Sequence, residues 1–276
     1  PTLHSSLFTF HFSLFTFHFS LFTLHFSLSP MSLSRLILSL ALSFLGVPYV
    51  AGTLEVNAPD ERLVVNSEGV DCTTFVDQVL ALTLDSLDGA GMETHLQRLR
   101  YRDGIVDGYA SRLHYFTDFV ADGIRKGLLT DVLAAWPDST VTRVGEVTLS
   151  FMTTHPQSYA QLKDNPAEVA ALRTVEGRYR RYPYCYLPTA ALARLDRAHS
   201  PIRDGDVIAL VTTVDGLDVT HLGFAVWQGD APRDLHLLHA SSAKGKVILD
   251  PQPLCDYLAP RKSCPGIRVV RLNSDY

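Results

Sequence analysis

The spacing of hydrophobic residues changes once along the chain, close to Pro201. Before this point, in several stretches, apolar residues recur every three or four positions, which is the period of an amphipathic helix. After it, apolar and polar residues alternate in short runs that are separated by turn residues, as is typical of strands. Helices early in the chain and consecutive strands late in it predict an α+β domain whose strands form an antiparallel meander.

The helical spacing covers residues 72–84, 110–126 and 164–181. In the first of these stretches the predicted apolar face consists of Phe75, Val76, Val79, Leu80 and Ala81. The strand pattern predicts strands at residues 206–212, 220–227, 234–241, 246–250 and 267–272. We expect the helix that begins at residue 72 to pack on the sheet that these strands form.

The chain begins with a repeated segment. Residues 6–26 read SLFTFHF, SLFTFHF and SLFTLHF, and no charged side chain precedes Arg35. Because seven is odd, the alternation of apolar and polar positions changes face at every repeat, so no single strand or helix face persists. We interpret residues 1–31 as a low-complexity extension outside the fold, consistent with a start at Met31. The alternative is a membrane-inserting segment, against which the recurring Ser, Thr and His residues count.

Residues 35–51 support two interpretations. Arg35 followed by LILSLALSFLGV has the composition of a secretory signal, with a plausible cleavage after Ala51. The same stretch places Leu36, Leu40 and Phe44 four residues apart, with Ile37 and Ala41 on the adjoining row, as in a helix that faces a core. We favour the helix, because cleavage would remove most of the motif GVPYVAGTLE. Residues 32–276 are then predicted to form one domain with helical insertions.

Composition narrows the range of functions. The 276 residues carry a formal net charge of -5, with 46% hydrophobic and 19% charged residues, which describes an ordinary soluble globular protein. The one basic run, RYRRY at 178–182, is too short to neutralise a nucleic-acid backbone, so no nucleic-acid partner is expected. Four cysteines are too few for a disulfide scaffold. Cys255 and Cys264 lie close in sequence and could form a bridge if the protein is exported.

Cys72 lies where a loop becomes a helix, in the stretch GVDCTTFVD. A helix N-terminus favours a thiolate through its unpaired N–H groups and its dipole, and Asp71 is a plausible N-cap. Taken alone, the cysteine is equally explained as a small buried side chain. As a nucleophile it would need a base from elsewhere in the fold.

Two histidines are candidates for that base and its partner. His221 begins the strand THLGFAVW, and His239 ends the next strand, LHLLHAS. Sequential strands joined by a short turn tend to pair, so these side chains can be neighbours across the sheet. His239 shares a strand face with Leu237, whereas His236 points the other way. We therefore predict that His221 is the base and that His239 orients it.

The motifs, in their order, resemble those of the NlpC-type cell-wall cysteine hydrolases, a papain-like superfamily. The fuller set resembles one branch, the N-acetylmuramoyl-L-alanine amidase-like proteins, also known as domain of unknown function 1460. It comprises PYVAGTLE, VDCTTFVD, SRLHYF, FMTTHP, GDVIAL, GLDVTHLGFAVW and LHLLHAS. The resemblance runs from about residue 36 to the C-terminus, and only the tail before Met31 falls outside it.

The resemblance implies a papain-like fold of the α+β class with the nucleophile at the N-terminus of a helix packed on an antiparallel sheet. It implies a catalytic triad of Cys72, His221 and His239 that uses no cofactor and no metal. The implied reaction is hydrolysis of the amide between the lactyl group of N-acetylmuramic acid and L-alanine, in peptidoglycan fragments. Soluble anhydro-muropeptides would be preferred over intact sacculi.

Further residues of these motifs are candidates for binding. In such proteins Tyr49 would lie beside the nucleophile, and with the backbone N–H of Cys72 it could stabilise the oxyanion of a tetrahedral intermediate. Side chains that could grip muramyl or peptide groups are Glu55, Arg112, His114 and His155. Each of these four is also explained as a solvated or structurally paired side chain.

Three other interpretations stay open. An endopeptidase that cuts within the peptide stem would share every catalytic residue and differ in its pocket. A module that binds cell-wall fragments without turnover is disfavoured by the intact set of Cys72, His221 and His239. A zinc site built from the same three residues has acceptable ligand types. A muropeptide substrate favours the cell envelope or periplasm, although the equivocal signal leaves the cytoplasm open, and no stable membrane insertion of the domain is expected.

Overall fold

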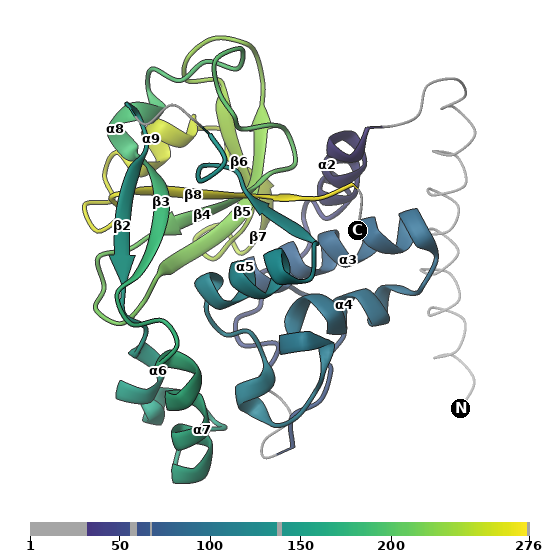
Figure 1. Ribbon diagram of the computed structural model, residues 1–276. Helices are drawn as coiled ribbons and strands as arrows, with labels where there is room; N and C mark the ends of the chain where they lie inside the picture. Colours follow the sequence, from purple (N-terminus) through teal and green to yellow (C-terminus); the bar gives the residue numbers. More distant parts are fainter. Residues whose placement is uncertain (1–31, 56–59, 67, 137–139, 275–276) are drawn as a thin grey trace, which may run out of the picture. The chain divides into compact units, whose positions relative to one another are not determined.

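A computed structural model describes residues 32–55, 60–66, 68–136 and 140–274 (Figure 1). The chain divides into two units, residues 1–32 and 33–276, and the second unit contains every element described below. The repeated segment lies outside the described residues, so the interpretation of residues 1–31 stays a prediction.

Eight α-helices are described. They are α2 (Leu33–Ser43), α3 (Cys72–Asp88), α4 (Met92–Arg100), α5 (Phe116–Arg125), α6 (Phe151–Thr154), α7 (Pro166–Glu176), α8 (Thr189–Leu192) and α9 (Leu254–Leu258). Short 3-10 turns span Arg102–Gly104, Tyr109–Ser111 and Pro156–Ser158. The helix predicted from residue 72 is confirmed. The one predicted over residues 110–126 is wrong in its first half, because the Arg112 backbone is extended and its guanidinium binds the Leu54 carbonyl oxygen at 2.8 Å.

The strands are β1 (Leu129–Asp131), β2 (Arg143–Val147), β3 (Tyr182–Pro188), β4 (Val207–Val211), β5 (Val219–Trp227), β6 (Leu235–Ser241), β7 (Lys246–Leu249) and β8 (Gly266–Leu272). They form one sheet in the order β2-β3-β8-β4-β5-β6-β7, with β1 also paired to β8 and every pair antiparallel. The predicted meander is therefore confirmed as β4 to β7. The last strand, β8, returns to pair with β4, and the strands β1 to β3 were not predicted.

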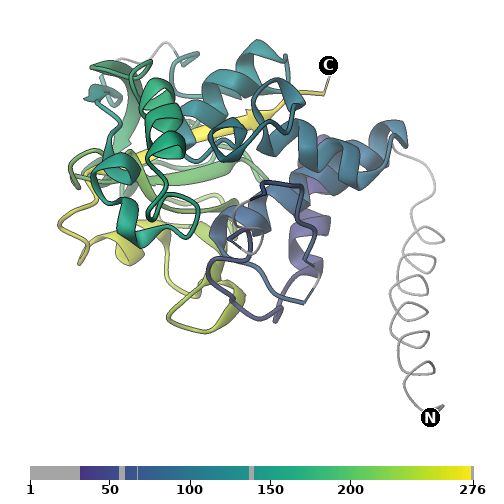
Figure 2. The same ribbon diagram turned by 90° about the horizontal axis from the view of Figure 1, so that it is seen from below.

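Helices cover both faces of the sheet (Figures 1 and 2). Helices α2 to α5 share one core cluster with alternate residues of β5, such as Phe224, whose ring meets that of Phe75 edge-on at 5.4 Å. On the other face α8 and α9 pack against the intervening residues, such as Ala225 and Leu237. Burying one large apolar side chain stabilises the fold by about 1.5–3 kcal/mol. The packing thus fixes which face each β5 and β6 residue occupies.

A third cluster joins α6 and α7 to the segments around β2 and β3, at the lower left of Figure 1. At the start of the second unit, residues 33–43 form helix α2. Its most buried residues are Ile37 and Ala41, 3% and 0% exposed, so the row next to Leu36 and Leu40 faces the core.

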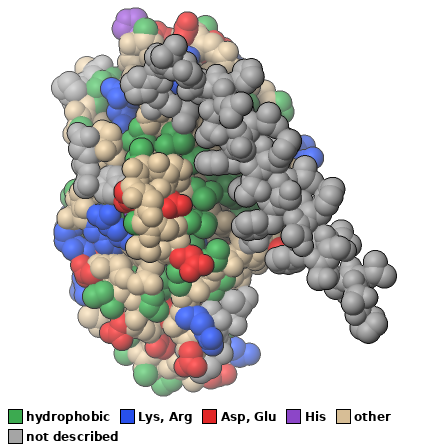
Figure 3. All heavy atoms as spheres, turned by 90° about the vertical axis from the view of Figure 1, so that its right-hand side faces the viewer, with side chains coloured by type: hydrophobic (Ala, Val, Ile, Leu, Met, Phe, Trp, Pro, Cys, Tyr) green, Lys and Arg blue, Asp and Glu red, His purple; other side chains and the backbone are tan. Residues whose placement is uncertain are grey.

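The surface is mixed in character. On the face shown in Figure 3, acidic and basic side chains lie among apolar ones. Within the described ranges no helix combines the length and the hydropathy that a membrane span requires.

Candidate active site

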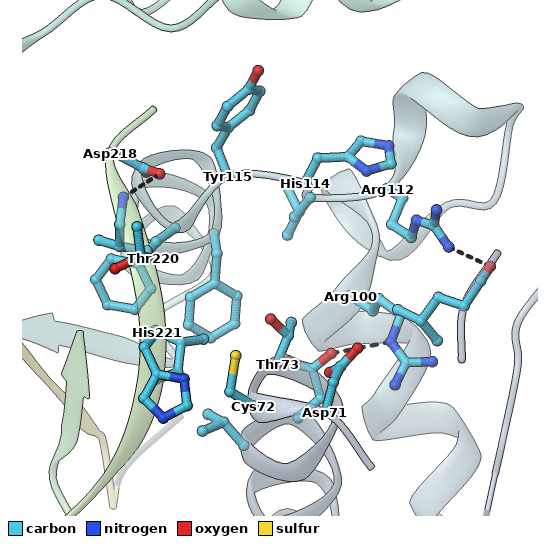
Figure 4. Close-up of a pocket in the computed structure, with 18 of the residues that line it drawn as sticks. Asp71, Cys72, Thr73, Arg100, Arg112, His114, Tyr115, Asp218, Thr220 and His221 are labelled. Carbon is cyan, nitrogen blue, oxygen red and sulfur yellow. Dashed lines mark hydrogen bonds and ion pairs between the residues drawn. The ribbon is translucent and has the colours of Figure 1, made fainter. Parts of the chain in front are cut away.

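A pocket of about 250 Å³ opens beside the first turn of α3 (Figure 4). Its walls come from five parts of the chain: residues 52–55, the first turns of α3, the end of α4, residues 112–119, and residues 217–222 at the start of β5. Among the lining residues are Glu55, Asp71, Cys72, Arg112, His114, Asp218 and His221.

The start of α3 positions the thiol. Asp71 is the N-cap: its carboxylate accepts from the Thr74 N–H at 2.8 Å, and the Thr74 hydroxyl oxygen accepts from the Asp71 N–H at 2.9 Å. This reciprocal capping box fixes the direction in which the chain enters the helix. Cys72 is therefore held in the first helical position, where its N–H has no intrahelical acceptor. That N–H is available to a ligand oxygen.

The two histidines are brought together by strand register. Because Phe224 pairs with Leu238, Gly223 lies opposite His239, and His221 lies diagonally across from it. Diagonal neighbours are within reach of large side chains. The His221 Nε2 lies 2.6 Å from the His239 Nδ1, and their rings meet edge-on. The predicted neighbourhood of the two side chains is thus present in the structure.

Gly223 makes this close approach possible. A Cβ atom at this position would lie 2.7 Å from the Leu238 carbonyl oxygen and 2.9 Å from the His239 Cβ. Any side chain there would push β6 or the histidine away. The glycine of the His-Leu-Gly motif therefore has a steric role in placing His239 beside His221.

The Cys72 thiol at the start of α3 and the His221 ring at the start of β5 are neighbours on the pocket wall (Figure 4). A backbone hydrogen bond from Leu222 reaches the Cys72 sulfur. Since the His221 Nε2 is engaged by His239, the Nδ1 is the ring nitrogen left to face the thiol. The arrangement can pass a proton from sulfur to imidazole.

Burial controls the charge state of this pair. The pKa of Cys72 is raised to about 11, first by burial and then by the Asp71 carboxylate, against hydrogen bonds from Leu222 and Thr73. Burial, followed by His239 and Arg261, lowers the pKa of His221 to about 3. The helix start was predicted to favour a thiolate, but burial and Asp71 outweigh it here. At neutral pH the thiol and the imidazole are both uncharged.

The opposite wall is a network of buried charges. Arg112, 3% exposed, pairs with Glu55 and lies 3.6 Å from Glu61. The Tyr109 hydroxyl donates to Glu55 at 3.2 Å. Burial lowers the pKa of His114, and its Nε2 lies 2.8 Å from the Tyr109 carbonyl oxygen. Glu55, Arg112 and His114 line the pocket as a preformed wall.

Two predicted site residues, Tyr49 and His155, are not among the residues that line the pocket. The segment around Tyr49 runs beside Val70, just before the nucleophile, and burial followed by the Cys72 and Asp71 charges raises the pKa of the Tyr49 hydroxyl. The tyrosine is thus near the thiol, although it is not among the residues that line the pocket. The structure does not bring His155 to the pocket. Its exposed ring stacks on Phe151 with ring centroids 4.4 Å apart.

Several residues of the site were not predicted. Arg100 donates to the Asp77 carboxylate at 3.1 Å and to the Val64 carbonyl oxygen at 2.6 Å, which ties the segment before α3 to α4. Asp218 accepts from the Thr117 N–H at 2.6 Å. Of these residues only Asp77 could have been found from the sequence, because it stands five residues after Cys72 in the motif VDCTTFVD.

In the described part of the chain, no group of three or more His, Cys, Asp and Glu side chains is arranged to hold a metal ion. In the alternative zinc site, the His221 Nε2 and the His239 Nδ1 face each other at a distance of 2.6 Å. All four cysteines are free, including the buried Cys255 and Cys264.

Comparison with known proteins gives consistent results. The family model described as N-acetylmuramoyl-L-alanine amidase-like matches residues 39–267. An N-acetylmuramoyl-L-alanine amidase from Bacteroides uniformis ATCC 8492 is 41% identical, with a TM-score of 0.80 over 87% of this chain and 99% of that chain. A Bacteroides fragilis protein named as a candidate xylanase is 43% identical, with a TM-score of 0.77 over 84% of this chain and 99% of that one.

A protein of domain of unknown function 1460 from Legionella pneumophila is 24% identical and has a TM-score of 0.65 over 87% of this chain and 89% of that one. At this identity the similarity concerns the fold alone. No curated protein sequence matches the chain.

Proposed function

Because the chain belongs to the N-acetylmuramoyl-L-alanine amidase-like family, we propose that it is a papain-like, NlpC-type cysteine amidase. Its substrate would be soluble peptidoglycan fragments, in which it hydrolyses the amide between N-acetylmuramic acid and L-alanine. The observation that carries this proposal is that Cys72 and His221 line one pocket, with His239 directly behind His221. Such a substrate favours a location in the cell envelope or periplasm.

The first half of the reaction forms a thioester. The Cys72 sulfur attacks the lactyl carbonyl carbon while its proton moves to the His221 Nδ1. The oxyanion accepts a hydrogen bond from the Cys72 N–H at the start of α3, and from Tyr49, whose raised pKa keeps its hydroxyl protonated. His221 then gives the proton to the alanine nitrogen, the C–N bond breaks, and the stem peptide leaves.

The second half restores the enzyme. His221 takes a proton from water, the hydroxide adds to the thioester carbonyl, and the C–S bond breaks. The thiolate recovers its proton from His221, and the muramyl lactate leaves as a carboxylic acid that ionises in water.

The charge state of the pair is compatible with this chemistry. The pKa values of about 11 and about 3 differ by about 8, so moving the proton from Cys72 to His221 costs about 11 kcal/mol before the two charges attract each other. That attraction recovers about 4 kcal/mol at contact in an effective dielectric of about 20. The remaining cost of about 7 kcal/mol fits within a barrier of about 16 kcal/mol, which corresponds to a turnover of about 10 per second.

The wall opposite the thiol would bind the substrate. Glu55 keeps 29% of its side chain exposed, so its carboxylate can accept from a sugar hydroxyl or a peptide N–H. Arg112 holds that carboxylate in place, and His114, kept neutral by its lowered pKa, can offer an uncharged ring. His155 stays a prediction that the pocket geometry does not support.

Glycoside hydrolysis, which the name of the Bacteroides fragilis relative suggests for that protein, needs two carboxyl groups free to act on the sugar bond. The carboxylates of this pocket are engaged. Asp71 caps α3, Asp77 pairs with Arg100, Asp218 accepts from Thr117, and Glu55 pairs with Arg112. The pocket therefore suits catalysis by a thiol nucleophile better than glycoside hydrolysis by two carboxyl groups.

The proposal is tested by mass spectrometry of the products after incubation with purified anhydro-muropeptides and, separately, with intact sacculi. The wild type should release the free stem peptide and the anhydro-muramyl sugar from the soluble substrate, and Cys72→Ala should release neither. Cleavage inside the stem would support the endopeptidase alternative with the same triad. No product from either substrate, with a folded protein, would reject the proposal and favour a binding module.

A further inference from the structure

We infer that Asp250 is a positioning residue that sets the direction of proton transfer along Cys72, His221 and His239. This rests on the proposed function only in that Cys72 is the nucleophile and His221 its base. The sequence suggested three members for this row, and the structure places a fourth side chain at its end.

The position of Asp250 follows from strand register. It is the residue after β7, and its N–H donates to the Leu237 carbonyl oxygen at 2.8 Å. Asp250 therefore lies diagonally across from His239 on the β7 side of β6, as His221 does on the β5 side. The Asp250 Oδ2 lies 3.5 Å from the His239 Nε2, and the two residues are 7% and 1% exposed.

The hydrogen-bonding capacity of each group gives the row a direction. A carboxylate only accepts, so the His239 Nε2 must carry the proton that faces it. The His239 Nδ1 is then an acceptor, and the His221 Nε2 must donate to it across the 2.6 Å contact. The His221 Nδ1 is left with a free lone pair toward the thiol. Each ring is thus fixed in the form with hydrogen on Nε2.

No other described group can impose this direction. The His239 Nε2 is buried and has no hydrogen-bond partner at normal distance among the described residues, and the Asp250 carboxylate lies 3.5 Å from it, about 0.5 Å beyond a normal hydrogen bond. The other charged or titratable groups that act on His239 are His221, Tyr257, edge-on at 5.5 Å, and Arg261. Burial and Arg261 lower the pKa of His239, and only Asp250 raises it. Asp250 therefore favours the positive charge that the row receives when Cys72 loses its proton.

The surroundings of Asp250 make an unusual prediction about its substitutions. Its second oxygen, Oδ1, accepts from the Gln252 N–H at 2.9 Å. In Asp250→Asn the single amide oxygen would stay with that N–H, and the NH₂ group would point at His239. Every hydrogen bond in the row would then reverse, and the His221 Nδ1 would present a hydrogen to the thiol. Asp250→Ala imposes neither direction, so the asparagine variant should be the more damaged of the two.

The test measures alkylation of Cys72 by iodoacetamide from pH 4.5 to 9, with mass spectrometry of each cysteine in the full-length protein. It needs no knowledge of the substrate. Below about pH 6 the reaction should become independent of pH, because the thiol proton goes to His221 and not to solvent. Cys185, which is half-buried, serves as an internal reference. The matched control is Asp256→Asn, which neutralises an exposed carboxylate paired with Arg233.

We expect Asp250→Asn to lower the plateau below pH 6 by about 10²-fold or more, as in serine proteases where the same change selects the wrong tautomer. Asp250→Ala should lower it less, and the thiolate reaction near pH 9 should change little in either variant. The ¹⁵N shifts of His221 and His239 at pH 7 should show hydrogen on Nε2 in the wild type and on Nδ1 in Asp250→Asn.

Hydrogen on Nδ1 of His239 in the wild type would overturn the inference even if neither variant folds. Equal losses for Asn and Ala, with unchanged tautomers, would also overturn it and leave Asp250 a purely structural role. If these results are as expected but anhydro-muropeptides are not cleaved, only the proposed substrate fails.

Discussion

Replacing Asp71 by asparagine separates two roles of this residue. Asparagine caps helices as well as aspartate does, so α3 should still begin at Cys72. The substitution removes the negative charge that, after burial, contributes most to the raised pKa of the thiol. A change in thiol reactivity would therefore report electrostatics and not loss of the helix start.

The size of the effect follows from Coulomb's law. Charges about 6 Å apart, as on neighbouring residues, interact by about 0.7 to 3 kcal/mol for effective dielectric constants between about 80 and 20. Removing the Asp71 charge should lower the pKa of Cys72, now about 11, by about 0.5 to 2. Each tenfold gain in thiolate is offset by about a threefold loss of nucleophilicity, so alkylation at pH 8 should become about 2 to 10 times faster.

The assay is the iodoacetamide reaction between pH 7 and 9, where thiolate formed by loss of a proton to solvent dominates. Asp88→Asn is the control, since it neutralises an acid at the other end of α3, about 24 Å from the thiol. An unchanged or slower reaction in a folded Asp71→Asn protein would refute the electrostatic argument. A fast reaction that is flat from pH 5 to 9 in the wild type would refute the uncharged pair itself.

Other perturbations test the fold around the site. Since the pKa of His221 is about 3 when folded and about 6.5 when unfolded, the unfolded state binds the proton first, and stability should fall by up to about 2.7 kcal/mol from pH 7 to 4.5 in urea titrations. His221→Gln should remove the contribution of His221 to that slope and leave those of His114 and His239, whose pKa values burial also lowers. Arg100→Met leaves the Asp77 carboxylate buried without its partner and should lower the free energy of unfolding by about 3–5 kcal/mol. Replacing the exposed Arg181 by alanine, which breaks only a surface ion pair with Glu146, should leave the free energy of unfolding nearly unchanged. Gly223→Ala should push the β6 histidine aside and abolish the low-pH alkylation plateau while the far-ultraviolet circular dichroism is kept.

Much of the sheet could be predicted because most of its strands show a local alternation of apolar and polar residues. Alternation along β5 and β6 indicated two paired strands, and parity separated His239 from His236, whose Nδ1 lies 2.9 Å from the Asp250 carbonyl oxygen. Strands β1 to β3 escaped prediction because they are short or, as in YPYCYLP, rich in aromatic residues without a clean alternation. Their strand form depends on pairing with β8 and with each other.

The site was predicted where one residue's local setting mattered and missed where distant segments meet. A capped helix start is visible in the sequence around Cys72, and the capping box confirms it. Arg100 could not be connected to Asp77 and Val64 from spacing, because its contacts depend on how α4 packs beside α3. The charge states of Cys72 and His221 could not be predicted from the sequence either, since burial is a property of the folded chain.

The diagonal placement of His221, His239 and Asp250 across three adjacent strands has a consequence for diversity among homologues. Each step crosses one strand boundary with an offset of two residues, so the row depends on strand parity. A single-residue insertion or deletion within β5 or β6, between Gly223 and His239, would turn the histidine to the opposite face although both histidines are kept. Changes confined to the turns that join these strands would leave the row intact. Homologues that keep the cysteine and both histidines can therefore be sorted into intact and broken rows by counting residues within the strands.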